Sequence, residues 1–479
     1  MMKSAKFVQG STFRHVSVMT LSSTVGLLAL FAVDLVDMYF LSLLGQEELA
    51  AAIGFSGTLL FFLTSVGIGI QIAMGALVSR AEGASNRELA SQYCSSVLLF
   101  SLIAALLVTL PAWFWLEDLL MFLGARDVTL SLAMDYSQIL LPSTPLLVCG
   151  MSAAATLRGL GDARNAMYTT LGAAIVNALL NPLFIFTFGL EIQGAAIASV
   201  ISRVALVGIA LYVVIRRHQI HCKPDFAQMR RDLTAILPIA VPAVLTNLAT
   251  PIGGSYVLRT MASFGDSAVA GAAILGRVTP VAFALIFALS GAIGPIIGQN
   301  AGADRYDRVR ATLLNALLIN FVYILFVWLV LYLAGDMIIS AFSASGDAAY
   351  LIDFYTTWLV IGFSFNGVLF IANAASNNLN HATQATLFNF AKALFGTIPL
   401  VYLFAQWFGA AGVLAGELAG AVVWGTIALA VVFWQIRQLE REHTSVSCTE
   451  PEVTEAMASP FSSSQCQLGC SYVKSSEDK

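Results

Sequence analysis

Hydrophobic residues along this chain come in long blocks separated by short polar connections. We read twelve blocks, each near or above the roughly 20 residues that a helix needs to cross a bilayer. Their approximate ranges are 16–44, 51–78, 91–115, 129–155, 166–189, 194–215, 234–263, 268–298, 311–334, 348–376, 384–407 and 411–436. Blocks of this length, without the period-two alternation of an outer-membrane barrel, predict an all-α membrane protein with twelve transmembrane helices.

The composition supports this interpretation and excludes a soluble protein. Of the 479 residues, 58% are hydrophobic and only 11% are charged, and the mean hydropathy is +0.81. Soluble domains carry about 25% charged residues. We therefore expect the lipid bilayer to contact most of the surface. The polar start "MMKSAKFVQGSTFRH" and the long first block argue against a cleavable signal peptide.

The basic residues predict the orientation in the membrane. Of the 24 Lys and Arg residues, 19 lie in the termini or in the connections that follow even-numbered helices, as in "RRHQIHCKPDFAQMRR". Such residues accumulate on the cytoplasmic side of a membrane. The sequence therefore predicts a multi-pass protein of the inner (plasma) membrane with both termini in the cytoplasm.

An internal repeat at a spacing of about 219 residues divides the chain in two. "GQEELAAAIGFSG" (45–57) is echoed by "GDSAVAGAAILGR" (265–277), and "MDYSQILLPS" (134–143) by "DFYTTWLVIG" (353–362). We expect two pseudo-symmetric six-helix lobes, 1–215 and 234–436, joined by a basic cytoplasmic linker, 216–233. The polar stretch 437–479 has no hydrophobic periodicity and is predicted to be a disordered cytoplasmic tail.

The repeat favours a transporter. Each half begins on the cytoplasmic side, so the halves are related by an axis along the membrane normal. Transporters built in this way bind substrate and ion near mid-membrane and alternate access. A channel and a non-transporting scaffold are the alternatives, and no structured soluble segment supports the scaffold.

Two aspartates lie within the first apolar block, in "FAVDLVDMYFLSLLG" (31–45). Carboxylates at membrane depth are costly and usually functional. Asp34 and Asp37 lie on consecutive helical turns, where two close carboxylates favour uptake of a shared proton. For Asp34 a simple hydrogen bond to a neighbour is the alternative.

Further oxygen-bearing residues lie in blocks 4, 5 and 6. Asn177 and Asn181 share one helix face because they are four residues apart, while Tyr136 and Ser199 lie on neighbouring helices. Carboxylate, amide, hydroxyl and phenol oxygens suit Na⁺, and they would serve a proton equally well. Hydrogen bonds that pack helices together are the structural alternative for the asparagines.

The second half lacks this set and has charges of its own. Near the positions equivalent to the two aspartates it has Gly254 and Val257. The charges could repel a cationic cargo, pair with one another or bind an anionic group. The candidates for a substrate cavity in this half are Arg259, Lys392, Glu417, Asn366 and Tyr355.

Several functions lack sequence support. No GxxxxGK[ST] stretch is present for ATP, and no catalytic constellation is apparent. We expect a protein that is not an enzyme and needs no cofactor beyond a coupling ion. The basic residues mark topology and do not indicate a nucleic-acid partner. We expect a monomer.

Residues 15–436 resemble the MATE (multidrug and toxic compound extrusion) transporters. The resembling stretches are "VDMYFLSLLGQEELAA", "TLRGLGDARNA" (156–166), "VNALLNP", "GAAIAS" and "GPIIGQNAGADRYDRVR". The resemblance implies export of drug-like amphipathic compounds, often cationic, in exchange for Na⁺ or H⁺. It also implies that Asp37 is the coupling carboxylate, with Tyr136, Asn177, Asn181 and Ser199 around it and Asp34 as an addition to the pattern.

The chain departs from both main branches of that family. Some DinF-like members have an aspartate in place of Asn181 and a threonine in place of Ser199. NorM-type members carry acidic residues in helices 7 and 10, where this chain reads "VPAVLTNLAT" and "FSFNGVLF". A second ion site in the C-terminal half is therefore not expected, and the choice between Na⁺ and H⁺ stays open.

A lipid-linked oligosaccharide flippase of similar two-lobe architecture is the main alternative. Its cavity would need cations to hold a pyrophosphate, and Arg259 and Lys392 could supply them. The two aspartates and the connection motifs favour a coupled multidrug exporter instead.

Overall fold

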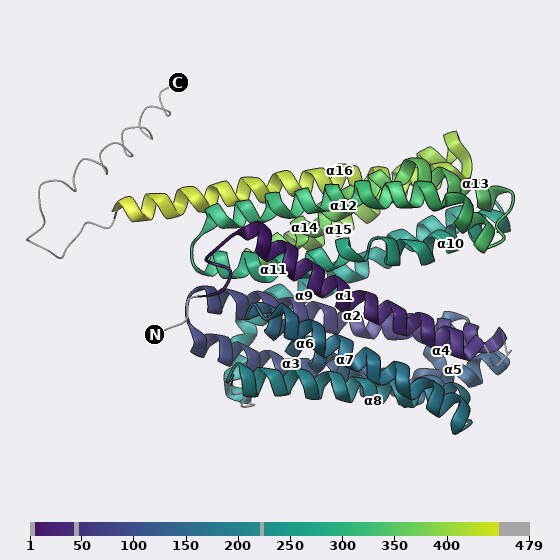
Figure 1. Ribbon diagram of the computed structural model, residues 1–479, viewed down its shortest axis with the longest axis horizontal. Helices are drawn as coiled ribbons and strands as arrows, with labels where there is room; N and C mark the ends of the chain where they lie inside the picture. Colours follow the sequence, from purple (N-terminus) through teal and green to yellow (C-terminus); the bar gives the residue numbers. More distant parts are fainter. Residues whose placement is uncertain (1–4, 43–46, 221–224, 450–479) are drawn as a thin grey trace, which may run out of the picture.

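The computed structural model describes the backbone of residues 5–42, 47–220 and 225–449, and within it all side chains except those of 34–39, 41–42, 47–48, 50 and 443–449. Every regular element in these ranges is a helix, and the helices form two lobes (Figure 1). The N-lobe comprises α1 Thr12–Ser42, α2 Glu47–Gly83, α3 Arg87–Phe114, α4 Leu116–Leu123, α5 Asp127–Leu140, η1 Leu141–Ser143, α6 Thr144–Gly159, α7 Ala163–Pro182, η2 Leu183–Thr187, α8 Glu191–Tyr212 and η3 Val213–Arg217.

The C-lobe begins after the connection between η3 and α9. It comprises α9 Phe226–Ala262, α10 Asp266–Ala282, α11 Ala284–Gly302, α12 Tyr306–Ala341, α13 Asp347–Phe354, η4 Tyr355–Leu359, η5 Val360–Phe363, α14 Ser364–Asn378, α15 Ala382–Ala391, η6 Lys392–Thr397 and α16 Ile398–Thr449. Helix α1 packs against α7 of its own lobe and against α11 and α12 of the other.

The helices make twelve membrane passes. Eleven helical stretches of the described residues are long and apolar enough to cross a membrane. The last, Ala382–Glu442, has 61 residues and would be about 90 Å long if straight, three times the bilayer core. It turns at Gly409, whose φ of 61° is a left-handed conformation that favours glycine. This stretch therefore crosses twice, which confirms the predicted twelve-helix, two-lobe fold.

Three predicted helices are broken in the middle. Helix 4 changes to a 3-10 turn at Leu141–Ser143, and helix 10 does so at Val360, 219 residues later, so the repeat extends to the backbone. The predicted helix 268–298 is divided by Phe283, three residues after Pro280. Phe283 stacks on Phe363 at the break in helix 10, with ring centroids 3.9 Å apart.

Two predicted boundaries are wrong. Helix α16 continues through 437–449, part of the predicted disordered tail, because "RQLEREH" contains strong helix formers and no Gly or Pro. Helix α9 begins at Phe226, inside the predicted linker, where the Asp225 carboxylate accepts hydrogen bonds from the Ala227 and Gln228 amides. The other parts of both regions, 450–479 and 221–224, lie outside the described residues.

The lobes pack closely at the face that contains the described N-terminal segment, which we call the terminal face. Helix α2 of the N-lobe packs against α9 and α11 of the C-lobe. A methyl group at Gly83 would overlap the Gln299 carbonyl, and one at Gly302 would overlap the Arg80 carbonyl. Glycine is therefore required at both positions for the backbones to approach this closely.

The N-terminal segment itself bridges the two lobes at the terminal face. Phe7 is 1% exposed, and its amide donates to Gln299 Oε1 at 2.9 Å. The Phe7 carbonyl accepts from Arg308 Nη2 at 2.8 Å in the C-lobe. Lys6 Nζ donates to the Gly161 carbonyl of the N-lobe at 2.7 Å. These contacts close the terminal face in this conformation.

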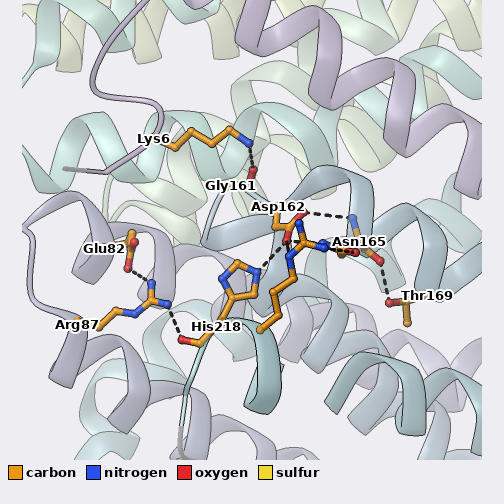
Figure 2. A network of polar contacts seen from close by, with 9 residues as sticks. Lys6, Glu82, Arg87, Gly161, Asp162, Asn165, Thr169 and His218 are labelled. Carbon is orange, nitrogen blue, oxygen red and sulfur yellow. Dashed lines mark hydrogen bonds and ion pairs between the residues drawn. The ribbon is translucent and has the colours of Figure 1, made fainter. Parts of the chain in front are cut away.

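A polar network within the N-lobe supports this face (Figure 2). Asp162 caps α7 and accepts from Asn165, while its Oδ2 lies 2.8 Å from His218 Nε2. Burial raises the pKa of Asp162. The hydrogen bonds from His218 and Asn165 lower this pKa by more than burial raises it, so the pKa lies well below the usual range of an aspartate. Arg87 pairs with Glu82 and donates to the His218 carbonyl. The network links the start of α7 to the end of η3.

Candidate functional site

A chain of neutral polar side chains lies between α7 and α8 in the N-lobe. Asn181 Nδ2 donates to Asn177 Oδ1 at 3.0 Å, and Asn177 Nδ2 donates to Ser199 Oγ at 3.1 Å. Asn177 is 3% exposed and Asn181 is fully buried, while Ser199 is half-buried. The structure thus brings together three of the predicted ion-site residues.

The backbone changes shape directly after this chain. Helix α7 ends at Pro182, and the five-residue π-helical segment η2 follows. Proline has no amide hydrogen, so the Ala178 carbonyl loses its α-helical donor. Wide turns of this kind are frequent at functional sites. The asparagines therefore lie beside a locally loosened stretch of helix.

The helix that carries the two aspartates runs alongside. Helix α1 packs against α7, and the Phe40 ring contacts Phe186 of η2 edge-on at 5.9 Å. The side chains of Asp34 and Asp37 lie outside the described residues, so their part in the site stays a prediction. Tyr136 on α5 is half-buried against an apolar cluster, and its part likewise stays a prediction.

The N-lobe chain needs a charged partner to bind a cation. Its members offer amide and hydroxyl oxygens, which are hard ligands but carry no net charge. Carboxylates normally supply the charge in oxygen sites for metal cations. A coupling proton likewise needs a group that titrates, which amides and a serine hydroxyl do not supply. Asp37 of the adjacent helix is the predicted source.

The C-lobe has a different polar interior, between α14 and the α15–η6 helix. Lys392 Nζ donates to Asn366 Oδ1 at 2.7 Å, and one turn earlier Asn389 Nδ2 donates to Asn373 Oδ1 at 3.0 Å. Lys392 is half-buried and begins the π-helical segment η6. We call these four residues the C-lobe polar seam.

Two further predicted residues lie near the seam. Glu417 on α16 is half-buried and interacts electrostatically with both Lys392 and Tyr355. Tyr355 is 7% exposed and is hydrogen-bonded to Thr279. Among the described residues, no carboxylate oxygen lies within 4.0 Å of Lys392 Nζ. The lysine is therefore held by an amide rather than by a direct ion pair.

Arg259 does not join this group. The sequence places it among the buried charges of the C-lobe and allows a pair with Glu417. In the structure it is exposed, and the salt bridges of the described residues include no such pair. Helix α9 ends at Ala262, only three residues later. A long cationic side chain near a helix end can extend to the membrane interface, which explains the error.

A crevice of about 770 Å³ lies between the lobes. Its walls are mostly apolar, and Arg277 is the one charged residue among the described residues that line it. We call it the inter-lobe crevice, and its lining residues are Ile53, Gly54, Gly57, Thr58, Phe61, Phe62, Leu123, Pro251, Ser255 and Arg277.

Two arginines within the apolar blocks, Arg203 and Arg277, are not among the site candidates that the sequence suggests. Arg277 lines the inter-lobe crevice. Arg203 Nη1 donates to the Leu140 carbonyl at 3.1 Å and to Ser143 Oγ at 2.8 Å, at the break in helix 4. Their signal was present, because a charge inside an apolar block usually has a specific role.

Comparison with known proteins assigns the chain to a family. Residues 23–183 and 242–403 match the MatE family model. The two matched stretches begin 219 residues apart, and each falls in one lobe, as the repeat requires.

Individual relatives match over most of their length. A protein of Shewanella oneidensis named FAD transporter is 30% identical over 83% of this chain and 89% of its own length. The multidrug export protein MepA of Staphylococcus haemolyticus is 24% identical over 89% of this chain and 94% of its own. The crystal structure of a mutant of the Vibrio cholerae MATE transporter VcmN superposes with a TM-score of 0.85 at 25% identity, covering 90% of this chain and 98% of that one.

Proposed function

This chain belongs to the MatE family of membrane transporters, and from that premise we propose that it exports amphipathic organic compounds in exchange for Na⁺ or H⁺. It is a multi-pass transporter and not an enzyme. The proposal includes the inner membrane as its location, with the terminal face on the cytoplasmic side, because the basic connections lie there. Family membership favours export over the flippase and over a non-transporting scaffold.

The observation that carries the coupling proposal is the chain Asn181–Asn177–Ser199 beside α1. Three oxygen-bearing side chains converge next to the helix that contains Asp37. A cation bound there would join α1 to α7. Because α1 also packs against the C-lobe helices α11 and α12, its position affects how the lobes meet. An ion drives transport only if it binds the two access states unequally.

The cargo is the less defined part of this proposal. The family resemblance predicts amphipathic cations, and MepA is named a multidrug export protein. The Shewanella relative is named for FAD, which is an anion. A specific observation favours the second class: the described residues that line the inter-lobe crevice include an arginine and no carboxylate.

Transport in proteoliposomes tests the proposal. Purified protein would be reconstituted, and movement of ethidium and of FAD would be followed under a Na⁺ gradient alone and a H⁺ gradient alone. We expect one gradient to drive at least one cargo against its concentration. Cargo transport at the same rate with a Na⁺ gradient, with a H⁺ gradient and without any gradient would contradict coupled export. Empty liposomes provide the background.

A further inference from the structure

Arg277 lies at membrane depth, and no described side chain forms an ion pair with it. Helix α10 begins at Asp266, so Arg277 is eleven residues, or about 16 Å, along it. This distance reaches about the middle of a 30 Å bilayer core. The side chain is exposed and lines the inter-lobe crevice. The salt bridges among the described residues include none to Arg277.

An arginine in this position is unfavourable unless something compensates it. Charged residues within membrane-spanning helices face cavities and mark binding sites or ion paths, since the alternative is an uncompensated charge. The other lining residues within the described part of the chain are uncharged. The negative charge of a compound bound in the crevice would therefore compensate the Arg277 charge.

The opposite wall provides an aromatic surface. Phe61 and Phe62 of α2 line the crevice, their rings edge-to-face with centroids 6.3 Å apart. They are 43% and 44% exposed, so a planar ligand could cover them. Thr58 and Ser255 add hydroxyl groups to the lining. The crevice volume is within the range of small-molecule sites.

We propose that the inter-lobe crevice binds an aromatic compound carrying a phosphate or carboxylate, with Arg277 as its counter-ion and Phe61 and Phe62 against its ring. Resting on the export proposed above, this assigns the class of cargo. Arginine presents a planar set of donors that matches both acid groups. The site would select against the cationic drugs that the family resemblance predicts.

The repeat shows that the cation belongs to one lobe only. Gly57 and Arg277 end the two echoing stretches, and both line the crevice. A Cβ at Gly57 would have no atom within 4 Å, so the crevice is open at that position. The N-lobe thus leaves room where the C-lobe supplies the charge.

Flavin binding to the purified protein in detergent tests the assignment. Riboflavin and riboflavin 5′-phosphate share a fluorescent ring and differ by one phosphate. The riboflavin derivative whose terminal CH2OH is oxidised to a carboxylate carries the other acid group on the same ring and chain. We expect at least one anion to bind about tenfold more tightly than riboflavin, the value of one charge-assisted hydrogen bond of roughly 1.4 kcal/mol. Whichever anion binds more tightly identifies the acid group.

Variants locate the effect. Arg277→Gln should remove the preference for the anion and leave riboflavin binding intact, which also shows that the variant is folded. Arg277→Lys should keep part of the preference. Phe61→Leu should weaken the binding of all three flavins by a similar factor. Arg259→Gln is the matched control, because Arg259 is an exposed cation on α9 that does not line the crevice.

Two results would overturn the inference: equal binding of all three flavins by the wild type, or a preference that survives in Arg277→Gln. Either result leaves coupled export standing if ethidium still moves under an imposed gradient. Conversely, the protein could prefer anionic flavins in an Arg277-dependent way and yet transport no cargo under either gradient. That result would refute the proposed export and support the proposed binding site.

Discussion

The two lobes of this protein share a backbone plan and differ in the chemistry of their interiors. Both break their fourth helix at the same repeat position, Leu141 and Val360. Between its helices the N-lobe has the neutral chain Asn181–Asn177–Ser199, and the C-lobe has Lys392 held by Asn366. Helix breaks depend on backbone geometry along whole helices, whereas a binding site needs only a few side chains. Two halves with one fold can therefore take different roles.

This contrast suggests a division of work in which the N-lobe binds the coupling ion and the C-lobe supplies charge for the cargo. Each of the following changes tests that division.

The largest effect is expected from Asp37→Asn. The substitution removes the predicted coupling charge next to the α7 asparagines, so gradient-driven transport should fall to the level of empty liposomes. Uptake is measured in proteoliposomes after matching the amount of reconstituted protein. Asp34→Asn is the comparison and should retain clearly more activity. Wild-type transport rates in the Asp37→Asn variant would show that the predicted N-lobe site does not couple the ion to the cargo.

Lys392→Met should give a smaller effect of a different kind. It removes the cation of the C-lobe polar seam, and the Asn366 carbonyl loses its 2.7 Å donor. We expect a several-fold lower rate for anionic cargo with an unchanged dependence on the driving ion. Initial rates measured across a series of ion concentrations separate the two effects. A shift in ion dependence would mean that the lobes do not divide the work.

Gly83→Val should alter the balance between access states rather than the chemistry of either lobe. Its side chain would overlap the Gln299 carbonyl and push the lobes apart at the terminal face. Accessibility of a cysteine introduced near this contact should rise in the variant. Gly75→Ala in the same helix is the control, because a Cβ there meets no atom within 4 Å. Unchanged accessibility would show that this contact does not hold the face closed.

Asp162→Asn should have the smallest effect. Asparagine can still cap α7, so the change chiefly removes the negative charge that lies 2.8 Å from His218 Nε2 and 3.9 Å from Arg217 Nε. The pKa of Asp162 is lowered in the fold, since its hydrogen bonds outweigh burial, so its charge stabilises the fold above the unfolded-state pKa of about 4. We expect the substitution to lower the free energy of unfolding by up to about 1 kcal/mol at pH 7.

The pH dependence of this stability difference tests the direction of the Asp162 pKa shift. The stability difference between Asp162→Asn and wild type should shrink as the pH falls below the unfolded-state pKa, because the carboxylate then binds a proton in the unfolded state while it stays ionised in the fold. Thermal unfolding in detergent at several pH values measures it. A difference that grows towards acid would contradict the lowered pKa.

Local patterns were enough for part of the candidate site. The four-residue spacing of Asn177 and Asn181 predicts one helix face, and the two do bond to each other. Their link to Ser199 on α8 is a tertiary contact that no spacing could reveal. Arg259 and Arg277 both lie in apolar blocks, yet only packing places one near a helix end and the other in a crevice between lobes.

The sequence by itself determined the twelve passes, the duplicated lobes and the helices that carry polar residues. These follow from the thickness of the bilayer and the cost of burying charge, which act on each segment separately. The tertiary structure alone decided which polar side chains meet, where the lobes touch and what lines the space between them. Those features depend on distances between helices far apart in the chain, and a one-dimensional pattern does not contain them.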